Sequence, residues 1–174
     1  ISDEYGLSNT VSGTLLSAHS LGNLTAGFLA GILPVYLGRK KAIIFLCSFV
    51  VVGFAIMIMT GNPVLLILGF LFTGISRGSI SNFNNSVVNE VSDSSPAALS
   101  FLHSIFAVGA LSAPFLVIFS TRLFGLSGWK VAAGIIIALA LVSMVLLSRM
   151  KLSDSAVKNK NATSYTFLKL NKTF

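Results

Sequence analysis

A stripe of polar residues inside an apolar segment is the part of this sequence best suited to chemistry. Arg77 is followed by Ser81, Asn84 and Asn85, at spacings of four, seven and eight residues. These spacings place the four side chains on one face of a helix. A guanidinium, a hydroxyl and two amides offer hydrogen bonds and one positive charge, but no pairing of a nucleophile with a base. The stripe therefore predicts the binding of a polar solute rather than catalysis, and we assign no catalytic residue.

Arg77 lies deep in its apolar segment, 13 residues after Val64, which is roughly 20 Å along a helix. An arginine inside a bilayer costs at least about 2.5–3.5 kcal/mol, which favours a functional role. The alternative is that Arg77 snorkels to the cytosolic surface and that the asparagines are emerging into water.

Three further polar side chains lie in apolar segments: Asn23, His103 and His19. Each could hydrogen-bond a solute, although a lone polar group in a helix bundle more often bonds a neighbouring helix. We add Asn23 and His103 to the candidate substrate-binding residues. Glu90 and Asp93 flank a short loop and are expected to be solvated.

The composition indicates a membrane protein. The chain has 174 residues, of which 54% are hydrophobic and 10% charged, against about 25% charged in a soluble domain. The net charge of +7 comes from cations beside apolar runs, so it indicates orientation in a lipid bilayer and no nucleic-acid partner. Cys47 is the one cysteine and no His/Cys cluster occurs, so neither a metal site nor a cofactor is predicted. The absence of a His/acid or Ser/His constellation argues against an enzyme.

Five apolar runs are long enough to position these side chains across a bilayer, because a spanning helix needs roughly 17–25 residues. The runs are continuous rather than alternating, which favours helices over strands. Asn62 and Ser95, each before a proline, are expected to cap helices, and Gly38 and Gly125 to end them. The predicted spans are Val11–Val35, Ala42–Thr60, Val64–Val88, Ala97–Ser120 and Val131–Ser148.

The distribution of cations predicts the orientation. Nine lysines and arginines lie on one side of the predicted spans and two, Arg122 and Lys130, on the other. Cations are retained on the cytoplasmic side, so we expect the N-terminus outside and the C-terminal tail in the cytosol.

An internal repeat indicates a transport function. GNLTAGFL (22–29) and GALSAPFL (109–116) agree at five of eight positions. The first run crosses outward-to-inward and the fourth inward-to-outward, so the copies are inverted, as in secondary transporters. At this offset of 87 residues the third span pairs with a helix before residue 1. We therefore expect a three-plus-three bundle that lacks its first helix.

The loop GILPVYLGRKKA resembles the signature between the second and third helices of the major facilitator superfamily. Gly31, Gly38, Arg39 and Lys40 match its gating-loop positions, whereas Val35 stands where the family has an acid. FLHSIFAVGALSAPFL (101–116) is similar to the fifth helix of fucose-permease-like members. Pro114 lacks a backbone donor and Gly109 lies a turn before it, which predicts a kink. The tail SYTFLKLNKTF (164–174) is similar to the segment before their seventh helix.

The resemblance implies a fragment covering helices two to six of twelve. Residues 1–150 are then most of the N-terminal bundle, and residues 151–174 belong to a cytosolic central loop in which Tyr165–Leu170 could form a short helix. The expected function is alternating-access transport of a small polar, sugar-like solute, with the missing second half of the transporter as partner. We expect an integral protein of a bacterial cytoplasmic membrane. A drug or metabolite antiporter and a non-transporting sensor or subunit remain alternatives.

Overall fold

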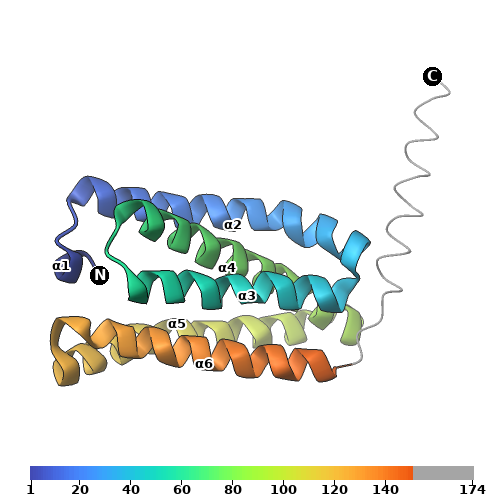
Figure 1. Ribbon diagram of the computed structural model, residues 1–174. Helices are drawn as coiled ribbons and strands as arrows, with labels where there is room; N and C mark the ends of the chain where they lie inside the picture. Colours follow the sequence, from blue (N-terminus) through green and yellow to red (C-terminus); the bar gives the residue numbers. More distant parts are fainter. Residues whose placement is uncertain (151–174) are drawn as a thin grey trace.

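The computed structural model describes residues 1–150, and the predicted all-α fold is confirmed. No strand occurs among these residues. The long helices run side by side along a common axis (Figure 1). The elements are α1 (Ser2–Tyr5), α2 (Asn9–Leu37), α3 (Arg39–Met59), α4 (Pro63–Val91), α5 (Pro96–Phe124), the 3-10 helix η1 (Gly125–Ser127) and α6 (Gly128–Arg149).

The predicted spans match these helices, which mostly extend one to four residues beyond them. Four helical stretches of the described chain are long and apolar enough to cross a membrane, and the last is Pro96–Arg149. This stretch reverses at η1, so that α5 and α6 lie antiparallel (Figure 1). It therefore supplies two crossings, which agrees with the five predicted spans.

Local sequence determines most of the helix ends. Gly38 (φ 78°) and Gly125 (φ 68°) follow α2 and α5 in conformations that residues with a Cβ rarely adopt. The Asn62 side chain accepts a 2.9 Å hydrogen bond from the amide of Val64 and caps α4. The expected cap at Ser95 is wrong, because its side chain makes no capping hydrogen bond and only the proline at the start of α5 remains as a signal.

Glycines bring α2 and α4 into backbone contact. A Cβ placed on Gly74 would collide with the carbonyl oxygen of His19, and one on Gly22 with that of Leu71. Gly78 packs against Ala26, which is fully buried. Small residues allow such close approach between membrane helices. The backbones of α2 and α4 therefore pack in direct contact.

The other helices surround this pair unequally. α3 packs against α4, where Gly53 and Gly69 again bring the backbones together. α6 packs on α3 and α5. α5 is the least covered of the long helices, because Ser120 is its one buried residue. One side of α5 is thus left without a partner in the described chain.

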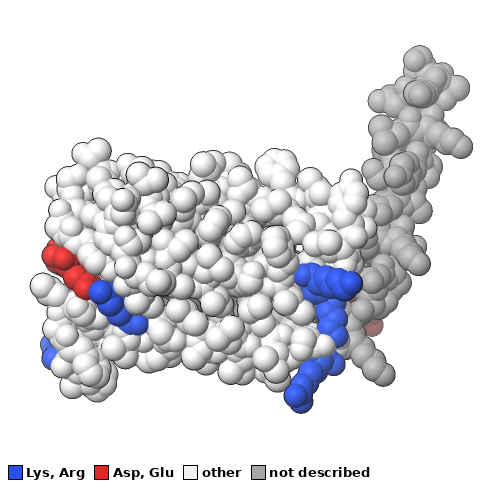
Figure 2. Space-filling view, in the orientation of Figure 1, with Lys and Arg blue, Asp and Glu red and all other residues white. Residues whose placement is uncertain are grey.

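Charged side chains gather at the two ends of the bundle. Figure 2 shows lysine and arginine at both ends and an uncharged surface between them in this view. Arg39, Lys40, Lys41 and Arg149 belong to the end where α2 meets α3, and Arg122 and Lys130 to the end where α5 meets α6. An uncharged surface between charged ends, on the face seen in this view, fits a protein that spans a bilayer.

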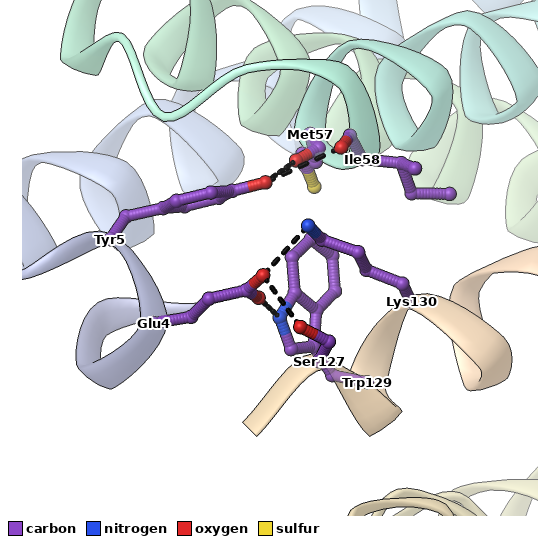
Figure 3. Close-up of polar contacts among 7 residues, drawn as sticks. All are labelled: Glu4, Tyr5, Met57, Ile58, Ser127, Trp129 and Lys130. Carbon is purple, nitrogen blue, oxygen red and sulfur yellow. Dashed lines mark hydrogen bonds and ion pairs between the residues drawn. The ribbon is translucent and has the colours of Figure 1, made fainter. Parts of the chain in front are cut away.

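A polar cluster that sequence reasoning did not foresee closes the N-terminal end of the bundle (Figure 3). The Glu4 carboxylate pairs with Lys130 Nζ at 2.7 Å and accepts hydrogen bonds from the Ser127 hydroxyl and from Trp129 Nε1. The Tyr5 hydroxyl donates to the carbonyl oxygen of Met57 at 2.9 Å. The short α1 therefore connects the last turn of α3 to η1 and the first turn of α6.

Glu4→Gln should lower the melting temperature at neutral pH by removing the ion pair. The hydrogen-bonded ammonium of Lys130 holds the pKa of Glu4 below its ordinary value of 4.5. A depressed pKa contributes stability above pH 4.5, and that contribution is lost as pH falls through the lowered pKa. The difference in melting temperature between wild type and Glu4→Gln should therefore be constant from pH 7 to 5 and shrink below pH 4.5. Asp3→Asn, at an adjacent exposed acid, is the control; a pH-independent difference for Glu4→Gln would contradict the assignment.

Candidate functional site

A cavity of about 350 Å³ opens between α2, α4 and α5, and it gathers the candidate substrate-binding residues. All six of them line it, from three separate helices. Its apolar lining comes from α4 and α5. The lining residues are Asn23, Arg77, Ile80, Ser81, Asn84, Asn85, Leu102, His103 and Phe106.

The glycine contact between α2 and α4 positions Asn23. A Cβ on Gly78 would lie 2.8 Å from the carbonyl oxygen of Asn23 and 2.5 Å from its side-chain oxygen. Only a residue without a side chain leaves room for the Asn23 amide over α4. Gly78 therefore allows α2 to pack against α4 and also leaves space for the Asn23 side chain at the cavity.

Arg77 is the middle residue of the 29-residue α4, so about 21 Å of helix lies on either side of it. Its side chain is exposed toward the cavity and makes no hydrogen bond or ion pair with any residue that the structure describes. None of the four described acids lines the cavity. The cavity thus combines one permanent cation with amide and hydroxyl groups.

His103 and His19 have different surroundings. His103 on α5 is exposed and faces the α4 stripe across the cavity. His19 is turned toward α4, where its Nδ1 lies 3.2 Å from Thr73 Oγ1. His19 therefore bonds a neighbouring hydroxyl, which is the structural role that a lone histidine in a bundle usually has.

The gating-loop residues lie at the opposite end of the bundle from α1. Gly31 and Arg39 line a second cavity of about 430 Å³ between α2, α3 and α4, while Gly38 forms the turn and Lys40 is the second residue of α3. Arg39 is buried, and its Nη1 donates to Glu90 Oε2 at 2.6 Å. The arginine therefore fastens the first turn of α3 to the last turn of α4.

Glu90 is exposed, as expected of a solvated acid, but it also forms an ion pair with Arg39 that the sequence analysis did not predict. α4 continues to Val91, so Glu90 projects from its last turn and reaches Arg39 instead of lying in a loop. Opposite charges at the adjacent ends of consecutive antiparallel helices are a signal that the sequence contains. This signal can be used only once α4 is known to extend to Val91, because only then does Glu90 lie on the helix end beside Arg39.

The predicted kink in α5 is not tested by the described geometry. Pro114 lies inside a helix that continues on both sides of it, and a Cβ on Gly109 would meet no atom within 4 Å. Both positions face away from the helices present. The predicted short helix at Tyr165–Leu170 lies outside the described residues.

Comparison with known proteins identifies the family. A model of the Major Facilitator Superfamily matches residues 1–172. An MFS-type transporter, criB of Aspergillus cristatus, is 38% identical over 69 residues, which are 40% of this chain and 15% of that protein. No solved structure matches. Because the family model spans nearly the whole chain, this protein belongs to the Major Facilitator Superfamily.

Proposed function

We propose that this chain is most of one bundle of a secondary transporter, and that the cavity lined by Arg77 is its solute site. The observation that carries the proposal is the convergence of six polar side chains from α2, α4 and α5 on one cavity within an apolar bundle. Family membership indicates a transporter rather than an enzyme. Polar groups within the membrane are costly and typically mark substrate pathways.

The solute we propose is small, polar and organic. The cavity of about 350 Å³ is near the lower end of the roughly 300–1,000 Å³ typical of ligand pockets. Its amides and hydroxyl suit a sugar-like solute rich in hydrogen-bonding groups. The fucose-permease-like subgroup and the bacterial origin stay predictions, and the relative named above is fungal.

The mechanism we propose needs a second bundle. Arg77, Ser81, Asn84 and His103 are exposed, and polar or charged side chains such as these are costly when they face lipid. A facing bundle would enclose them, and rocking of the two bundles about the cavity would give alternating access. In this proposal the residues after 150 begin the connection to that bundle.

The internal repeat supports a further helix beside α5. Gly22 and Ala26 on α2 are buried against α4. Their counterparts in the repeat, Gly109 and Ala113 on α5, are exposed. We propose that a helix preceding residue 1 covers them, as α4 covers α2.

Uptake measurements test the proposed function. The full-length protein that contains this chain should accumulate a radiolabelled polar solute in vesicles, whereas residues 1–174 alone should not. The reason is that one bundle presents only one wall of the cavity. Solute uptake by the isolated chain would contradict the two-bundle mechanism, and absence of uptake of a broad panel of solutes by the full-length protein would contradict transport.

We further propose that the α1 end of the bundle is extracellular and the Arg39 end cytosolic. The cations support this orientation, since four described ones lie at the Arg39 end and two at the other. In a Cys47→Ser background, an impermeant thiol reagent on intact cells should label Leu126→Cys and not Tyr36→Cys. Both positions are well exposed, at 66% and 82%. The reverse labelling pattern would invert the topology.

A further inference from the structure

The single positive charge in the cavity indicates which chemical class of solute the cavity would bind. Arg77 is its one permanent charge among the described residues. The described acids all lie elsewhere: Asp3 and Glu4 at the N-terminal end, Glu90 on Arg39, and Asp93 in the turn after α4. The bundle therefore carries an uncompensated positive charge at the centre of a membrane-spanning helix.

Among the described lining residues, nothing would balance that charge if the solute were neutral. When the site closes around its solute, water is displaced and the effective dielectric falls, so the charge becomes more costly. A solute that carries its own negative charge removes this cost on binding. The guanidinium also presents its N–H donors in a planar fork that matches the two oxygens of a carboxylate.

The net charge of the solute distinguishes a carboxylate from a phosphate ester as the better match for Arg77. A carboxylate contributes one negative charge, which equals the single charge of Arg77. A phosphate monoester carries about −1.5 to −2 at neutral pH and would leave negative charge without a partner. The rest of the lining offers amides for hydroxyl groups, together with Leu102 and Phe106 as an apolar wall for a carbon skeleton.

We propose that the solute of this cavity is a small organic monocarboxylate with hydroxyl groups, such as a sugar acid or a hydroxy acid. The proposal rests on the transport function proposed above and specifies its substrate class. Arg77 binds the carboxylate, and Asn84 and Asn85 hydrogen-bond the hydroxylated remainder. This solute is still sugar-like, as in the proposed function, but it also carries one negative charge.

The test measures ligand-induced thermal stabilisation and competition for uptake with the purified full-length protein. The probes are gluconate and lactate as carboxylates, glucose and lactamide as their neutral counterparts, and glycerol 3-phosphate as a phosphate ester. A carboxylate should bind at least tenfold more tightly than its neutral counterpart. Arg77→Gln should abolish that preference, and Arg122→Gln, at an arginine outside the cavity, should preserve it.

A second variant covers the possibility that Arg77→Gln fails to fold. Asn84→Asp keeps the shape of the side chain and places a negative charge on the same helix face, so it too should reduce the carboxylate preference. Equal binding of glucose and gluconate, or tighter binding of glycerol 3-phosphate, would overturn the monocarboxylate assignment while leaving transport intact. Absence of binding and of uptake for every probe would count against the proposed function as well.

Discussion

Gly74→Ala should sharply reduce the stability and the membrane abundance of the full-length protein. The added methyl group would overlap the carbonyl oxygen of His19, which is backbone and cannot rotate away. α2 and α4 would have to separate along their closest contact. Overpacking of a well-packed interior costs about 1–3 kcal/mol and occasionally more, and we expect the upper part of this range. Fluorescence-detected size-exclusion chromatography of a tagged protein, with a melting curve, measures both quantities.

Gly27→Ala is the matched control for that substitution. It adds the same methyl group on α2, at a position where a Cβ would meet no atom within 4 Å. Alanine also has the higher helix propensity, so this variant should be as stable as wild type or slightly more stable. Equal destabilisation by the two substitutions would show that the glycine contact between α2 and α4 is not the origin of the effect.

Arg77→Lys should reduce solute uptake at least tenfold while leaving membrane abundance unchanged. Lysine keeps the positive charge but offers a single ammonium in place of the planar fork. In the proposed solute site, the fork would bind two oxygens of the solute and the amides of α4 that line the same cavity would bind the rest. Arg77→Ala should transport no better than Arg77→Lys. Initial uptake rates at several solute concentrations separate a change in KM from one in kcat.

A snorkelling arginine makes the opposite prediction. If Arg77 only reached toward the cytosolic surface, any long cation would serve and Arg77→Lys would transport normally. Arg122→Lys, at an exposed arginine in the last turn of α5, gives the background effect of the exchange itself. Uptake by Arg77→Lys that equals uptake by Arg122→Lys would remove Arg77 from the solute site.

The helices could be predicted from sequence because each is a continuous apolar run bounded by a proline or a glycine. Ala42–Thr60 and Val64–Val88 fall within three residues of α3 and α4 at every boundary. The grouping of Ser81, Asn84 and Asn85 with Arg77 follows from helical spacing alone. Those parts of the site depend on one helix and on nothing else.

The remaining parts depend on packing between helices. Asn23 and His103 join the α4 stripe because α2 contacts α4 through glycines and α5 lies on the other side, and no spacing along the chain encodes that. The Arg39–Glu90 pair required the last turn of α4 to be located. The Glu4 cluster joins groups about 125 residues apart through a four-residue helix too short to be predicted.

Protection of a cavity thiol by the transported solute tests the central claim most directly. Leu102 belongs to the apolar wall of the cavity, and cysteine keeps a small apolar side chain there, so Leu102→Cys in a Cys47→Ser background should retain enough transport to be measured. Saturating solute should slow alkylation of this cysteine by N-ethylmaleimide several-fold and leave Leu126→Cys, at the exposed turn after α5, unaffected. Undiminished alkylation of Leu102→Cys in a protein that is actively transporting that solute would show that the solute binds elsewhere.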